Sequence, residues 1–181
     1  RSGSLFLQSL LDGHPEVSTL PGYFFNGWFN QNSWPIFKPD YSNINWREQL
    51  VENVIKYFEP QFNANSKKNV IGRPNSDSSW LAHYTGFTQL GDNNSEILEL
   101  DQDIFKKHLN DLLFQYDEID PKVCFNAINE SFDKAYRQNL GNIEKVTLFH
   151  QHNPSFFERV NFNYFYPNNK TICVVRNPIQ M

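Results

Sequence analysis

Apolar residues recur every three or four positions in several stretches of the chain, and this spacing predicts amphipathic helices. The first such stretch runs from Leu5 to Leu11, and Gly13 followed by Pro15 should end it. The same pattern predicts four further helices, over residues 45–58, 101–116, 120–140 and 154–164.

The residues at the starts of these predicted helices suit their positions. Asn45 and Asp101 are good N-cap residues, because their side chains can accept hydrogen bonds from the free N–H groups of a first turn. Pro121 fits the first helical position, where its missing N–H costs nothing. In the last helix, the expected buried side consists of Phe156, Phe157, Val160 and Tyr164.

Two short apolar runs near the end of the chain, residues 145–150 and 170–175, predict strands on either side of the last helix. A strand, a helix and a second strand form a βαβ unit, whose right-handed crossover makes the strands parallel. Residues 70–72 are a weaker strand candidate. The carboxyl ends of parallel strands face the ligand crevice, which would place His150, His152 and Arg176 there. The fold class expected is therefore α/β.

Residues 18–41 are rich in aromatic side chains and are broken by Pro21, Gly22, Pro35 and Pro39, so loops and one short helix are expected there. Two interpretations stay open. The rings either fill the core and cover a nucleotide site, or some of them line a pocket for an acceptor molecule.

The chain has 181 residues, a net charge of -4 and a pI of about 5.7, so one domain with a real core is expected and a nucleic-acid partner is not. No apolar run approaches the length of a membrane span. Cys124 and Cys173 are isolated thiols, which favours a reducing compartment and thus the cytoplasm.

The start of the chain has the chemistry of an anion site. Ser2, Gly3 and Ser4 lead directly into the first predicted helix, whose free N–H groups would point outward with the positive end of the helix dipole. Gly3 allows close approach to the backbone, the hydroxyls can donate, and Arg1 adds a charged donor. A phosphate or sulfate is the expected ligand.

The motifs at both ends of the chain resemble those of sulfotransferases, of the bacterial and tyrosylprotein types. Arg1-Ser2-Gly3-Ser4-Leu5, followed by Leu10-Leu11-Asp12-Gly13-His14-Pro15-Glu16-Val17, resembles the family's 5′-phosphosulfate-binding loop and first helix. Leu5 stands where the common pattern has a second hydroxyl residue. Phe165-Tyr166-Pro167-Asn168-Asn169-Lys170, with Arg176-Asn177-Pro178 after the next strand, resembles the family's second motif.

This resemblance implies a P-loop NTPase-like fold of three layers, with a central parallel sheet, helices on both sides and a helical insertion. It also implies a single domain over residues 1–181, truncated at both ends relative to the family, with 3′-phosphoadenosine 5′-phosphosulfate (PAPS) as co-substrate. Arg1, Ser2, Gly3, Ser4 and Leu5 would hold the 5′-phosphosulfate, and Arg176 would hold the 3′-phosphate.

The resemblance further implies sulfonate transfer to a hydroxyl or amine of a small-molecule, carbohydrate or peptide acceptor. Aligned on Pro154, His152 takes the place of a cation that assists transfer, and His150 could act as the base, with the two roles reversible. Arg1 would assist as well. Many family members carry a Glu after the His-Pro string, whereas residues 20–23 here hold no carboxylate.

Three alternatives remain beside this hypothesis. A P-loop kinase would require a loop lysine and an acidic magnesium ligand, and neither is evident. A non-catalytic module that binds a nucleotide, carbohydrate or peptide on the same fold would keep the motifs without the chemistry. A metal role for His150 and His152 is disfavoured, because two imidazoles do not complete a zinc site.

Overall fold

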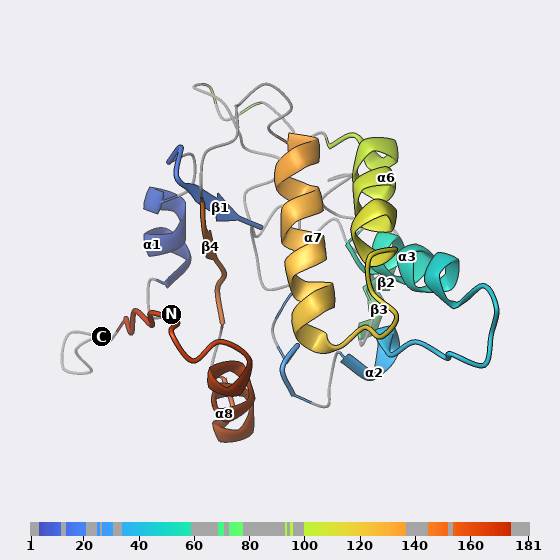
Figure 1. Cartoon of the computed structure of the whole chain (residues 1–181). Helices are drawn as coiled ribbons and strands as arrows, with labels where there is room; N and C mark the ends of the chain where they lie inside the picture. The colour runs from blue at the N-terminus through green and yellow to red at the C-terminus, as the bar shows by residue number, and fades with distance from the viewer. Residues whose placement is uncertain are drawn as a thin grey trace. The chain divides into compact units, whose positions relative to one another are not determined.

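The computed structural model describes residues 4–11, 14–20, 25, 27–30, 34–58, 69–70, 73–77, 93, 95, 100–136, 145–151 and 154–174 (Figure 1). Helices and parallel strands both occur among them, which confirms the α/β class. The chain forms two compact units. Unit 1 comprises Arg1–Pro35 and Gly141–Met181, and unit 2 comprises Ile36–Leu140.

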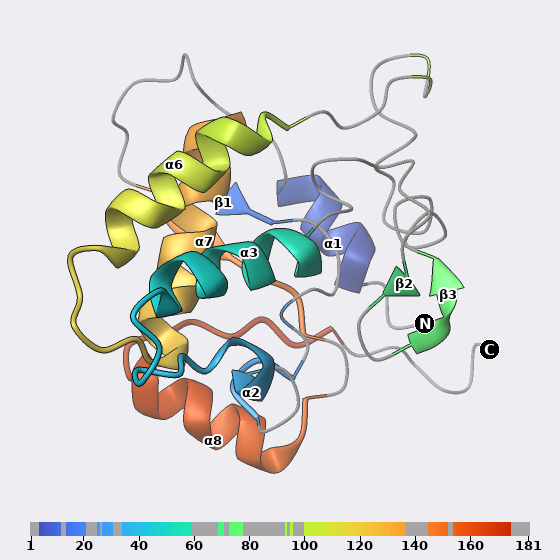
Figure 2. The same ribbon diagram turned by 90° about the vertical axis from the view of Figure 1, so that its right-hand side faces the viewer.

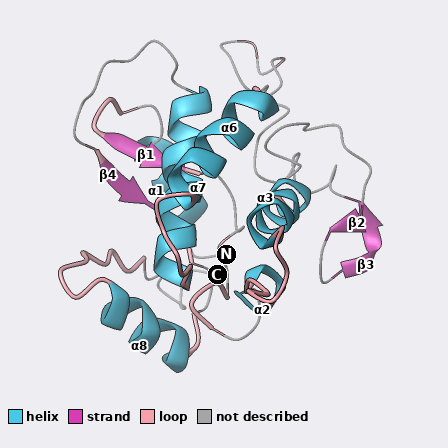
Figure 3. Cartoon of the chain, turned by 45° about the vertical axis from the view of Figure 1, so that its right-hand side comes forward, coloured by secondary structure: helices cyan, strands magenta, loops and turns pink. Residues whose placement is uncertain are grey.

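Unit 1 contains a parallel pair of strands, β1 (Val17–Thr19) and β4 (Val146–Leu148), in the register Val17 to Val146 and Thr19 to Leu148. The strand predicted over 145–150 is thus confirmed as β4. Its partner β1 follows the first helix, α1 (Ser4–Leu11), after a short turn. Figure 3 shows this pair in magenta next to α1.

The predicted apolar side of α1 is only partly correct. Leu7 and Leu11 are half-buried, but Leu10 is 64 % exposed. Gln8 is buried instead, because its amide donates to Thr19 Oγ1 at 2.8 Å and to the Leu20 carbonyl at 3.4 Å. Leu10 lies two residues after Gln8, which is about 200° further around the helix axis. With Gln8 facing the strands, Leu10 therefore faces away from them.

Helix α8 (Phe156–Phe165) confirms the last predicted helix, but its buried side is not the predicted one. Glu158 is buried, and the rings of Phe162 and Phe165 pack on Phe29. The opposite face of α8 carries the four residues expected inside, all of them exposed: Phe156 at 67 %, Phe157 at 70 %, Val160 at 47 % and Tyr164 at 81 %.

The strand predicted over 170–175 is wrong for the part of it that the structure describes. Lys170 to Val174 pair with no strand, and Ile172 is 64 % exposed. Cys173, expected inside that strand, is exposed as well. Without this strand, the described residues contain β4 and α8 of the expected βαβ unit but not its third element.

The described residues of unit 2 include three packed helices, α3 (Trp46–Tyr57), α6 (Gln102–Leu113) and α7 (Pro121–Tyr136). Helix α6 packs against both α7 and α3, as Figure 2 shows. Apolar side chains fill the space between the helices, where burial away from water stabilises the unit. The fully buried members include Leu50, Val54, Phe105, Leu109, Leu113 and Ile128. A short helix, α2 (Trp34–Phe37), lies where the chain passes from unit 1 to unit 2.

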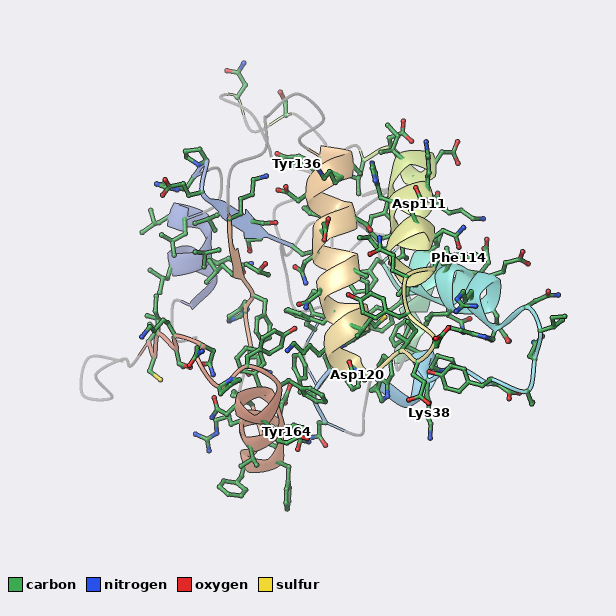
Figure 4. The ribbon with its side chains drawn as sticks, viewed as in Figure 1. Lys38, Asp111, Phe114, Asp120, Tyr136 and Tyr164 are labelled. Atoms are coloured by element: carbon green, nitrogen blue, oxygen red, sulfur yellow. The ribbon has the colours of Figure 1, made fainter. Side chains whose placement is uncertain are left out.

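Two of the three predicted helix starts in unit 2 are confirmed in detail. Asp101 Oδ1 accepts from the N–H groups of Asp103 and Ile104 at 3.0 Å each. Pro121 is the first residue of α7, and Figure 4 shows Asp120 and Tyr136 at the two ends of this helix. Asn45 precedes α3 as expected, but its side chain makes no capping hydrogen bond.

The second pair of strands, β2 (Asn69–Val70) and β3 (Arg73–Asp77), is antiparallel. The strand expected over 70–72 therefore includes Val70, while Ile71 and Gly72 lie outside the described residues.

Candidate functional site

The carboxyl edge of the β1–β4 pair is the candidate functional site. The turn between α1 and β1 is short, with Val17 N–H donating to the His14 carbonyl at 3.1 Å. Gln8, in the middle of α1, bonds to Thr19 at the end of β1, so the helix runs back along the strand. The first turn of α1 consequently lies at the edge where β1 ends. Because β4 is parallel to β1, it ends at the same edge.

The first turn of α1 suits an anion. Ser4 and Leu5 open this helix of eight residues, and its first turn contains no acidic residue. The first N–H groups of a helix have no acceptor within it, so they carry the positive end of the dipole. Phosphate and sulfate oxygens are the groups that such helix starts commonly bind.

His150 is the described member of the predicted catalytic pair. It follows β4 by two residues and is buried, with 8 % of its surface exposed. The strand pairing thus brings His150 and the first turn of α1 to one edge of the sheet. The other predicted site residues, Arg1, Ser2, Gly3, His152 and Arg176, lie outside the described residues.

Glu158 is a buried charged residue at this end of unit 1 that the sequence analysis missed. Its Oε1 accepts from the Gly27 N–H at 2.7 Å and from the Gln151 amide at 2.8 Å. Burial raises the pKa of Glu158 above the ordinary carboxyl value, and hydrogen bonds from Gly27, Ser155 and Gln151 oppose that rise.

Glu158 and Ser155 together form a capping box at the start of α8. Ser155 Oγ accepts from the Glu158 N–H at 3.1 Å, and the Ser155 backbone lies near enough to the Glu158 carboxylate to lower its pKa. The signal for this arrangement was present in the sequence as Ser-x-x-Glu before an apolar run. Nothing in that signal indicated that the glutamate would be buried.

Residues 27–30, which we name the aromatic loop, are fastened to α8 by backbone and amide groups. Gly27 has φ of 79°, a conformation that glycine adopts without steric cost and that aims its N–H at Glu158. Asn161 Nδ2 donates to the Phe29 carbonyl at 2.8 Å, and Asn30 Nδ2 donates to Ser155 Oγ at 3.2 Å. Three polar contacts therefore fix this loop on the first two turns of α8.

The described rings between residues 18 and 30 belong to the core of unit 1. Phe25, Trp28 and Phe29 are each no more than 2 % exposed. Their partners are other rings: Phe25 lies edge-on to Trp28 with centroids 5.2 Å apart, and Phe29 lies 6.3 Å from Phe149. Side chains already packed by protein cannot stack on an acceptor, so these three support the core-filling interpretation.

The described part of the chain contains neither a cluster of metal ligands nor a helix that spans a membrane. No group of three or more His, Cys, Asp or Glu side chains there could hold a metal ion. None of the described helices is long and apolar enough to cross a membrane.

The chain matches no protein-family model, no curated protein and no solved structure with which it was compared. Only its own residues and the geometry of the β1–β4 edge therefore bear on its function.

Proposed function

We propose that this protein is a sulfotransferase that moves a sulfonate group from PAPS to a hydroxyl or amine acceptor. The observation that carries the proposal is the parallel pairing of β1 with β4, which brings the first turn of α1 and His150 to one edge of a sheet. The sequence before α1 is rich in anion donors, and the sequence after β4 carries a second histidine.

The donor half of the proposed site is the start of α1. Arg1, Ser2 and Gly3 directly precede the helix, so their donors would join the free N–H groups of the first turn around the 5′-phosphosulfate. Arg176 would bind the 3′-phosphate. The absence of acidic residues from this turn fits a ligand of high negative charge. We also propose that this chain has a three-layer fold of the P-loop type.

The proposed reaction is a single displacement at sulfur. The acceptor oxygen or nitrogen forms a bond to sulfur while the bond from sulfur to the 5′-phosphate oxygen breaks, which leaves adenosine 3′,5′-bisphosphate. The proton of the acceptor passes to His150 or His152, and the other histidine together with Arg1 stabilises the negative charge on the departing phosphate. As in phosphoryl transfer, the protein contributes chiefly positioning and charge stabilisation.

Nucleotide binding is the first test. Thermal unfolding would be measured with adenosine 3′,5′-bisphosphate, with ATP as the control ligand. A ligand at about 100 times its Kd should add about 2.7 kcal/mol, which corresponds to a rise in Tm of roughly 5–10 °C for a chain of this size. The rise should be lost in Arg176→Ala. Equal rises with ATP, or none with the bisphosphate, would refute the donor site.

Turnover separates an enzyme from a binding module. PAPS would be incubated with a panel of phenols, sugars and amines, and released adenosine 3′,5′-bisphosphate would be quantified. We expect release that depends on the acceptor and falls about 100-fold or more in the His150→Ala, His152→Ala double variant. Binding of the bisphosphate without any turnover across the panel would favour a module that only binds nucleotide.

A further inference from the structure

Glu158 connects the turn just before α8 to the aromatic loop, whose Gly27 lies 131 residues earlier in the chain. Its carboxylate accepts from the Gly27 N–H in the aromatic loop and from the Gln151 side chain after β4, and its own N–H donates to Ser155 Oγ at the start of α8. The first two contacts are short, at 2.7 and 2.8 Å, as expected for hydrogen bonds to a charged acceptor. Gln151 lies between His150 and His152 in the chain.

Capping alone does not account for this arrangement. A capping box needs the Ser155 hydroxyl and a carboxylate that reaches back to the Ser155 N–H, and both groups usually stay in water. Glu158 is instead only 3 % exposed. Burying a carboxylate is unfavourable unless several donors satisfy it. Here two donors come from outside the helix, Gly27 in the aromatic loop and Gln151 in the turn before α8, so the buried carboxylate ties both segments to the helix.

On the basis of the proposed function, we propose that Glu158 is a positioning residue for sulfonate transfer. Through Gln151 it fixes the turn that carries His150 and His152, and through Gly27 it fixes the aromatic loop beside that turn. Glu158 itself does not touch the reacting atoms in this arrangement. Its role is to hold the histidines in one geometry relative to the first turn of α1, where the donor would bind.

The positioning role is tested by NMR on the whole chain, with Glu158→Gln and Gln151→Ala as the perturbing variants. Glu16→Gln makes the same chemical change at an exposed carboxylate in unit 1 and serves as the matched control. We expect the His150 imidazole resonances to shift in both perturbing variants and to stay unchanged in the control. Loss of the carboxylate charge should also speed exchange of the Gly27 amide by about tenfold, the effect of weakening one charged hydrogen bond.

Binding and turnover then separate positioning from general loss of structure. Both variants should bind adenosine 3′,5′-bisphosphate within about threefold of the unmodified protein, while PAPS turnover falls by about tenfold or more. Unchanged His150 resonances in both variants would overturn the inference, and so would losses of affinity and turnover in equal proportion. Gln151→Ala removes only one partner of Glu158, so it keeps the test decisive should Glu158→Gln not fold.

The outcomes for Glu158 and for the proposed function can be told apart. If the unmodified protein does not bind the bisphosphate, the sulfotransferase proposal fails, and so does the assignment of Glu158 to that reaction. If the bisphosphate binds but His150 and turnover are insensitive to both variants, only the role of Glu158 fails.

Discussion

The hydrogen bond between Gln8 and Thr19 should determine how firmly α1 is held on β1. Both residues are almost fully buried, at 7 and 5 % exposure, and Gln8 Nε2 lies 2.8 Å from Thr19 Oγ1. Gln8→Leu keeps a similar volume but leaves the Thr19 hydroxyl and the Leu20 carbonyl without this donor. A buried polar group that loses its partner costs about 1–3 kcal/mol, so we expect unit 1 to lose that much stability.

The paired substitution isolates the hydrogen bond from the change in packing. Thr19→Val alone removes the better of the two acceptors and leaves the Gln8 amide with the longer contact to Leu20, at 3.4 Å. When both partners become apolar, no unsatisfied hydroxyl remains, so the double variant should be more stable than the sum of the two losses predicts. The expected coupling is about 1 kcal/mol.

The coupling must be measured within unit 1, because two compact units need not unfold together. The Val146 N–H donates to the Glu16 carbonyl at 2.8 Å and thus reports on the β1–β4 pair. The hydrogen-exchange rate of this amide would be measured in the unmodified protein, the two single variants and the double variant. These four rates complete the double-mutant cycle. A coupling below about 0.3 kcal/mol, the usual error of additivity, would refute the argument that this bond holds α1 in place.

Three further predictions concern stability. Asp101→Ala removes the acceptor of two first-turn N–H groups and should destabilise unit 2 by about 0.5–2 kcal/mol in urea denaturation, with Asp103→Ala as the neighbouring control. Leu109→Ala, at a fully buried position between α6 and its neighbours, should cost about 2–5 kcal/mol in the same assay, whereas Leu112→Ala at a half-buried position should cost less. The raised pKa of Glu158 means that the folded state binds its proton more tightly, so stability from this group is greatest below the ordinary carboxyl pKa of 4.5 and falls as pH rises through the raised value. The stability difference between the unmodified protein and Glu158→Gln should therefore shift in favour of Glu158 on acidification, and a difference that does not change between pH 4.5 and 7 would contradict the burial effect.

The helices were predictable because their signals are local. A periodic apolar pattern and a suitable start residue lie within one stretch of sequence, as at Asp101 and Pro121, and both starts formed as expected. Asn45 shows the limit of this reasoning. The Asn43 side chain accepts from the Asn45 N–H at 2.9 Å and so holds the turn that precedes α3. The Asn45 side chain itself makes no capping hydrogen bond.

Strand β1 was not predicted because its evidence is not local. Val17, Ser18 and Thr19 are too few to show an alternating pattern, and two of them are polar. What makes this segment a strand is its pairing with β4, far along the chain, and the Gln8 amide that satisfies the buried Thr19 hydroxyl. Conversely, residues 170–174 have the composition of a strand but pair with no strand among the described residues.

Helix α8 shows why periodicity can choose the wrong side of a helix. Two stripes on it carry large apolar residues, one with Phe156, Phe157, Val160 and Tyr164, the other with Phe162 and Phe165. Counting apolar residues favours the first stripe, yet it is the second that packs on unit 1: Glu158 is buried, and Phe162 and Phe165 are half-buried. The decision comes from polar groups, since Glu158 and Asn161 share the second stripe and bind the aromatic loop. The buried Glu158 carboxylate and its hydrogen-bond donors therefore had more influence than the larger apolar stripe on which side of α8 packs inward.

The donor-binding half and the histidine half of the proposed site depend on different polar contacts. Their roles can therefore be tested separately. Gln8 holds α1, whose first turn would bind the donor, whereas Glu158 holds the turn that carries the histidines. Substitution at Gln8 should therefore weaken binding of adenosine 3′,5′-bisphosphate, and substitution at Glu158 should slow transfer with little change in that affinity. If instead both substitutions change affinity and turnover together, α1 and the histidine turn behave as one element, and the assignment of donor binding and proton transfer to separate contacts would be wrong.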